Sequence, residues 1–131
     1  MSLHLGFFKD FKFRDSVLLE GSARDIEQLA EYIAAFASSH ESALAIHSLA
    51  SVAPNHPAQL FVSHSARRTS FQGVAQFSWL CSSEELPTVL GKLQPLATSR
   101  SGHQYFDLIG STVQLIVSVG EYGLSWWQVH G

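Results

Sequence analysis

The stretch SVLLEGSARDIEQLAEYIAAFASS, residues 16–39, contains the change of periodicity that decides the fold class. Residues 17–20 continue an alternation that begins at residues 11–14, and this period-two pattern predicts two short strands joined by a turn at Arg14-Asp15. After Ser22 the apolar side chains recur at every third or fourth position, which is the spacing of one helix face. They are Ile26, Leu29, Ala30, Ile33 and Ala37.

The start of this helix has its own signal. Ser22 and Asp25 stand three residues apart, the arrangement of an acidic capping box in which each side chain accepts a backbone N–H of the first turn. The sequence therefore predicts a strand pair followed directly by an amphipathic helix.

The remaining elements follow from the same two periodicities. Strands are expected at residues 44–49, 60–65, 74–81, 104–109, 112–119 and 124–129. A second helix is expected to begin after Ser83 and to end at Pro95, and Gly110-Ser111 is the expected two-residue turn of a hairpin. The order β-β-α-β-β-β-α-β-β-β predicts one α+β domain over residues 1–131, with a largely antiparallel sheet and two helices packed on one face. A ferredoxin-like β-α-β-β-α-β core with added strands is the specific topology we expect.

Composition narrows the class of protein. Hydrophobic residues make up 46% of the chain and charged residues 15%, against about 25% charged in an average domain, so some apolar surface is expected to be buried against a partner. The net charge of −3 argues against a general binder of nucleic acid or of acidic membranes. The single cysteine, Cys81, fits a reducing compartment, and neither a signal peptide nor a long apolar span is apparent, so we expect a cytoplasmic protein.

No motif in the chain specifies a reaction. The seven histidines lack the close spacing of zinc ligands, and residues 123–127 have a tryptophan where the nucleophile elbow requires its second glycine. Cys81 lies among apolar residues, where a thiol is inert, and Arg67-Arg68 has no glycine-rich phosphate loop beside it. We therefore expect no metal, no cofactor and no catalytic residue.

The best ionisable cluster is at the end of the chain. His103, Tyr105 and Asp107 share one parity of an expected strand, so they would lie on one face, with Glu121 beyond the following strand. The four side chains could form a small-ligand site or an active site, or they could belong to the ordinary polar face of an antiparallel sheet.

The last residues offer a different kind of site. On an expected terminal strand Trp126 and Trp127 would point to opposite faces, so one of them would remain outside the core. Outward tryptophan and tyrosine are enriched at protein interfaces, which makes Tyr122, Trp126 and Trp127 the interface candidates.

The segment HQYFDLIGSTVQLIVSVGEY, residues 103–122, resembles small bacterial immunity proteins of polymorphic toxin systems through its H-x-Y strand and its late E-Y pair. The resemblance covers about the last quarter of the chain and implies binding and blocking of a cognate toxin without catalysis. We thus expect a non-catalytic protein-binding domain, either immunity-like or homodimeric, with no nucleic-acid or membrane partner. The alternative is a small-ligand-binding protein or enzyme that uses His103, Tyr105, Asp107 and Glu121.

Overall fold

The computed structural model describes residues 2–65 and 75–131. The Arg67-Arg68 pair and Val74, the first residue of one expected strand, lie outside the described residues.

The larger sheet has five strands in the order β4-β1-β2-β8-β7. Its strands are β1 (Leu3–Phe11), β2 (Arg14–Gly21), β4 (Ala50–Val52), β7 (Gly102–Asp107) and β8 (Gln114–Val119). β1 and β2 form an antiparallel hairpin, as do β7 and β8, and the central strands β2 and β8 pair in parallel with Val17 opposite Leu115. The continuous apolar runs VLL of β2 and LIV of β8 are typical of strands that are covered on both faces.

A smaller sheet has the order β3-β5-β6 and contains β3 (Ala43–Ala45), β5 (Ala58–Ser63) and β6 (Ala75–Leu80). A short 3-10 helix, η1 (Ile46–Ser48), connects β3 to β4. The strand expected at residues 44–49 is therefore correct only for residues 44–45, the end of β3. Residues 46–48 form η1 and the next strand begins at Ala50, because the chain crosses there from the smaller sheet to the larger one.

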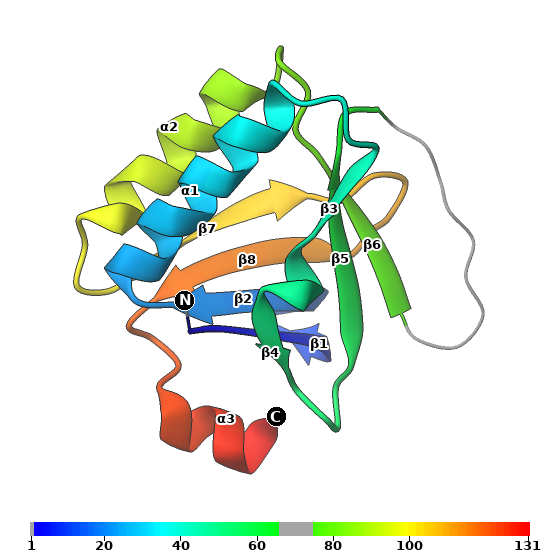
Figure 1. Cartoon of the computed structure of the whole chain (residues 1–131). Helices are drawn as coiled ribbons and strands as arrows, with labels where there is room; N and C mark the ends of the chain where they lie inside the picture. The colour runs from blue at the N-terminus through cyan, green and yellow to red at the C-terminus, as the bar shows by residue number, and fades with distance from the viewer. Residues whose placement is uncertain (1, 66–74) are drawn as a thin grey trace.

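Helices α1 (Ala23–Ala37) and α2 (Leu86–Ala97) lie side by side over one face of the larger sheet (Figure 1). They bury one continuous core with alternate residues of the central strands and with the smaller sheet; its fully buried members include Leu19, Ile26, Ile33, Leu93 and Val117. The predicted packing of both helices on one face is confirmed. The capping box is also confirmed, since Ser22 Oγ accepts the N–H of Asp25 and Asp25 Oδ2 accepts the N–H of Ser22.

The other face of the sheet is covered by α3 (Leu124–His130), which lies on the opposite side from α1 and α2 in Figure 1. A second buried cluster joins Phe8, Leu18 and Ile116 to Trp127 of this helix. The strand expected at residues 124–129 is therefore wrong. The segment is a helix because its tryptophans pack on an apolar sheet face, which outweighs the strand preference of a WWQV sequence.

The α+β class is confirmed, but the expected sheet topology is not. Antiparallel and parallel pairs occur together, so the sheet is mixed. Elements in the order expected of a ferredoxin-like core do occur, but their strands are divided between the two sheets, and the central pair β2-β8 joins strands from the two ends of the sequence.

Several expected boundaries also shift. The first turn lies at Lys12-Phe13, between β1 and β2, and not at Arg14-Asp15. The hairpin across Gly110-Ser111 is longer than a two-residue turn, because β7 ends at Asp107 and β8 begins at Gln114. Helix α2 begins at Leu86 and continues through Pro95, which lies in its last turn.

Candidate functional site

Polar side chains form a row across one face of the larger sheet, near the carboxyl ends of β2 and β8. The register places Glu20 opposite Ser118, with His4 next to Glu20 on β1 and His103 next to Ser118 on β7. Paired residues of neighbouring strands share a face, so four strands contribute to one line of polar groups. The carboxyl ends of parallel strands are common ligand sites in open α/β sheets.

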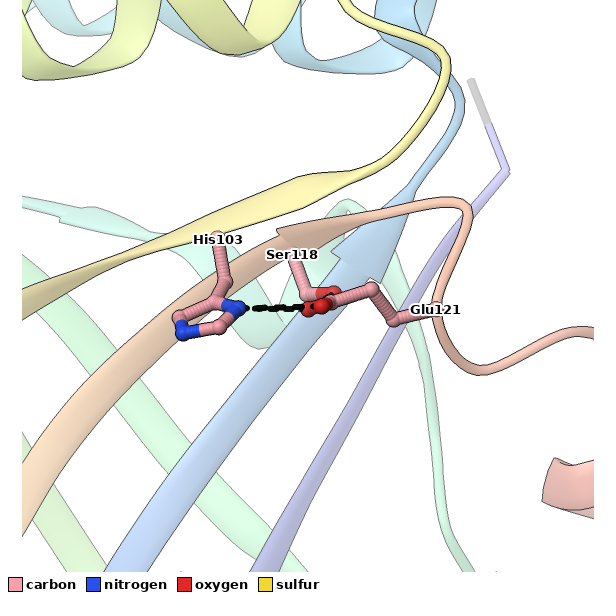
Figure 2. Close-up of polar contacts among 3 residues, drawn as sticks. All are labelled: His103, Ser118 and Glu121. Atoms are coloured by element: carbon pink, nitrogen blue, oxygen red, sulfur yellow. Dashed lines mark hydrogen bonds and ion pairs between the residues drawn. The ribbon is translucent and has the colours of Figure 1, made fainter.

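Glu121 joins this row from the loop after β8. His103 Nδ1 lies 2.8 Å from Glu121 Oε1, and Ser118 Oγ donates to the same oxygen at 2.8 Å (Figure 2). The side chains of His103 and Glu121 are 29% and 26% exposed, so the pair is partly shielded from water.

Gly120 makes this return of the chain possible. Its φ is +68°, and a Cβ at this position would lie 2.2 Å from the carbonyl oxygen of Arg100. Only glycine fits such a close approach in the left-handed region. The tight turn at Gly120 directs Glu121 back over the sheet face toward His103.

The two carboxyl groups of the site are shifted in opposite directions. Burial alone would raise the pKa of Glu121, but hydrogen bonds from His103 and Ser118 outweigh it and lower this pKa below its ordinary value of 4.5. Burial dominates for Glu20 and raises its pKa above 4.5, although Ser118 and the backbone N–H groups of residues 121 and 122 act in the other direction. Glu20 is only 4% exposed, and its Oε2 has no hydrogen-bond partner among the described residues.

A pocket of about 230 Å³ lies beside Glu20. Its walls come from the start of β1, the end of β2 and the loop before α3, and include His4, Glu20, Gly120, Tyr122 and Gly123. We call it the Glu20 pocket. His4 is held in the wall by stacking on Trp127, with 5.2 Å between the ring centroids.

The hydrogen bonds of the row do not form a nucleophile–base pair. The Ser118 hydroxyl donates to Glu121 and not to His103, so Ser118 and His103 do not form a serine–histidine pair. Glu121 fixes Nδ1 of His103, which leaves Nε2 as the free nitrogen of that ring. Among residues 2–65 and 75–131 no three His, Cys, Asp or Glu side chains are grouped as metal ligands.

The expected cluster is brought together in part. His103 and Tyr105 make an edge-to-face contact with 5.1 Å between ring centroids, and His103 binds Glu121. Asp107 shares their face but lies at the far end of β7, opposite Gln114. Tyr105 and Asp107 instead line a second, open pocket of about 590 Å³ between β7 and α2. There Lys92 donates to the Tyr105 carbonyl and lies 4.4 Å from the centre of the Phe106 ring.

The interface candidates lie mostly inside the molecule. Trp127 is 7% exposed and donates from Nε1 to the carbonyl of Tyr122 at 3.1 Å. Trp126 is half-buried and contacts Phe8, Phe11 and Tyr122. The expectation that one tryptophan points away from the core is wrong, because on a helix both rings reach the same sheet face.

The most exposed large apolar side chain among the described residues is Phe13, at 102% of its reference area. Phe13 lies at the tip of the β1–β2 turn (residues 10–14), where Asp10, Lys12 and Phe13 have φ of 52°, 50° and 70°. Non-glycine residues rarely adopt this left-handed region, so the turn stores strain.

The strained turn is braced from three sides. Arg14 donates to the carbonyl of Thr112 at 2.7 and 3.2 Å, and Asp15 accepts the N–H of Asp10 at 3.0 Å. Beneath the turn, Ser16 Oγ lies 3.0 Å from the carbonyl oxygens of Phe11 and Arg14 and accepts a hydrogen bond from Gln114. These contacts hold the backbone of the turn on both sides of Phe13.

The sequence did not indicate Glu20 or Phe13 as functional residues. A carboxylate at the end of the apolar run VLLE was a signal for Glu20, but its burial depends on the β2-β8 pairing.

Comparison of this chain with known protein families, with curated proteins and with solved structures gives no match. No helix in the described ranges is long and apolar enough to cross a membrane.

Proposed function

We propose that this chain is a non-catalytic protein-binding domain that contacts its partner through the β1–β2 turn. The observation that carries the proposal is the fully exposed Phe13, held in a strained and braced conformation. Backbone strain that the surrounding structure maintains is often found at functional sites.

The energetics of the turn favour binding. A large aromatic side chain that enters a partner's pocket buries much apolar area, and such residues dominate the free energy of many interfaces. The braces around Phe13 reduce the entropy that is lost on binding, because the turn is ordered before the partner arrives.

The charge around Phe13 indicates the chemistry of the partner. Its basic neighbours in the sequence are Lys9, Lys12 and Arg14, against the carboxylates of Asp10 and Asp15, and the Asp15 carboxylate already accepts the backbone N–H of Asp10. The partner surface would be an apolar pocket with an acidic rim. The resemblance of residues 103–122 to immunity proteins supports a toxin as that partner, and a homodimer through the same turn is the narrower alternative.

The test is co-purification of the tagged chain with the product of each neighbouring gene, followed by titration of any complex. We expect one product to bind, and Phe13→Ala to weaken this binding at least about tenfold. Tyr32→Ala is the matched control, because Tyr32 is also an exposed aromatic side chain (47%) but lies on α1. Equal binding by Phe13→Ala and the wild type, or a chain that stays monomeric and binds none of these products, would contradict the proposal.

A small-ligand or catalytic role for His103, Tyr105, Asp107 and Glu121 is the second candidate. It is favoured by the 2.8 Å contact between His103 and Glu121, which fixes one ring nitrogen and leaves the other free for a proton or a ligand. Its test is an NMR titration of the His103 ring in the wild type and in Glu121→Gln with candidate ligands. Ring signals that no ligand changes would exclude this role.

A further inference from the structure

The Glu20 pocket combines a shallow, open hollow with a carboxylate that has one unpartnered oxygen. Glu20 contributes to the wall, is 4% exposed, and has one carboxyl oxygen that no described donor reaches. Buried polar groups without a partner are rare in folded proteins, and each calls for an explanation, such as a missing ligand.

The groups around Glu20 compensate its charge only in part: Ser118 and the N–H groups of residues 121 and 122 lower its pKa, but burial outweighs them. No lysine or arginine is among the described residues that line the pocket. The single proton of the Ser118 hydroxyl goes to Glu121, which is itself an anion. A charge in this partly buried place interacts strongly with any ion that enters the pocket, because the effective dielectric constant is low.

The size and walls of the pocket limit what fits. A volume of about 230 Å³ lies below the range of about 300–1,000 Å³ that is usual for drug-sized ligands, so it suits the end of a chain. Tyr122 lines the pocket, and its ring has Lys12 Nζ at 5.9 Å from its centre, in agreement with the attraction of aromatic rings to such cations.

We propose that the Glu20 pocket binds one protonated nitrogen group, an alkylammonium or a guanidinium, whose charge pairs with the Glu20 carboxylate while Tyr122 contacts its carbon stem. The group belongs either to a free small amine or to a lysine or arginine side chain of a protein. This site is separate from the β1–β2 turn and does not depend on the proposed partner.

The experiment is a titration of the ¹⁵N-labelled chain with n-butylammonium chloride, at constant ionic strength, followed through the amide signals of Gly120, Tyr122 and Gly123. A parallel titration uses a five-residue peptide with one central lysine. We expect saturable shifts in about the millimolar range for at least one probe, and none with butan-1-ol. Tighter binding of the free amine would identify a small-molecule ligand, and tighter binding of the peptide a side chain of a partner.

Three variants test whether binding depends on the Glu20 charge and on the pocket. Glu20→Gln keeps the shape of the side chain and should weaken binding at least about tenfold. Glu41→Gln is the control for overall charge, because Glu41 is exposed and does not line the pocket, and should change binding by less than about threefold. Gly123→Val should narrow the pocket with Glu20 intact, because Gly123 lines the pocket and a Cβ at this position meets no atom within 4 Å.

Absence of saturable shifts with both probes, or equal binding by the wild type and Glu20→Gln, would overturn the proposal. If Glu20→Gln does not fold, unchanged binding in Gly123→Val would overturn it as well. Phe13→Ala should bind butylammonium like the wild type, so failure of this site and failure of the β1–β2 turn as an interface are distinguishable.

Discussion

His103 Nδ1 lies 2.8 Å from Glu121 Oε1, across the end of the β7-β8 hairpin, and Ser118 donates to the same carboxylate oxygen. Each of the two donors favours the ionised form of Glu121, which is why its pKa falls although burial opposes this. The contact ties the loop after β8 to the edge strand β7.

This contact predicts how stability depends on acid. Because the pKa of Glu121 is lowered in the folded chain, its contribution is fully present above about pH 4.5 and is lost as the pH falls through the lowered value. We expect Glu121→Gln to reduce the free energy of unfolding by about 0.5–1 kcal/mol at pH 6 and to have a steadily smaller effect as the pH falls below 4.5. Urea unfolding over this pH range measures the difference, and a loss that does not change with pH would contradict the assignment.

Glu20 should show the opposite dependence. Its pKa is raised in the folded state, so the stabilisation is fully present below about pH 4.5 and disappears as the pH rises through the raised value. We expect Glu20→Gln to be more stable than the wild type at neutral pH, because glutamine has no charge to bury, and to lose this advantage near pH 4. Thermal unfolding between pH 4 and pH 8 tests this. A variant that is less stable than the wild type at pH 7 would show that neighbouring groups compensate the Glu20 charge in the folded chain.

Strain at Phe13 predicts a separation of stability from binding. The side chain is fully exposed and loses no packing on removal, while glycine adopts a φ of +70° freely. Phe13→Gly should therefore raise the free energy of unfolding by up to about 1 kcal/mol and abolish partner binding. Phe7→Gly, elsewhere on β1, is the control and should destabilise the chain. A destabilised Phe13→Gly variant would mean that the ring packs on the molecule.

The two tryptophans of α3 should contribute unequally to stability. Trp127 is 7% exposed and bonded to the Tyr122 carbonyl, so Trp127→Ala should cost about 3–5 kcal/mol. Trp126 is half-buried, and Trp126→Ala should cost about 1–3 kcal/mol. Urea unfolding followed by far-UV circular dichroism gives both values. Losses below about 1 kcal/mol for both would show that α3 does not pack on the sheet.

The Cys81 thiol should be unreactive in the folded chain. Burial, together with the charge of Glu85, raises the pKa of its thiol to about 12, so almost no thiolate exists at neutral pH. We expect no reaction with a thiol reagent such as Ellman's reagent at pH 7.5 and complete reaction in urea. Rapid labelling of the native chain would show that the region around Cys81 opens.

The parts of the fold that local patterns determine were predictable. The helix after Ser22 has a capping box and a regular apolar face, and both describe α1 correctly. Helix α3 has neither signal: Trp127 is its only buried residue, and Gly123 makes no side-chain cap. Its structure depends on a sheet face that is formed by strands far away in the sequence, so periodicity could not reveal it.

The candidate site divides in the same way. Strand parity placed His103 and Tyr105 on one face, and the structure brings Glu121 to them. Glu20 enters the row only because β2 pairs with β8, and Phe13 is exposed only because the turn lies two residues earlier than expected. Pairing register and turn position depend on long-range packing, which a single sequence does not specify.

The pairing of β2 with β8 also has a consequence for synthesis. Ser16 and Gln114, which face each other in this pair, are 98 residues apart in the chain. The β1-β2 hairpin is therefore synthesised long before β8. Until β8 and α3 are made, Phe8 and Leu18 lack the contacts that Ile116 and Trp127 provide in the folded chain. Such distant pairing slows folding and exposes apolar strands meanwhile, so the nascent chain should depend on chaperones until its last segment emerges.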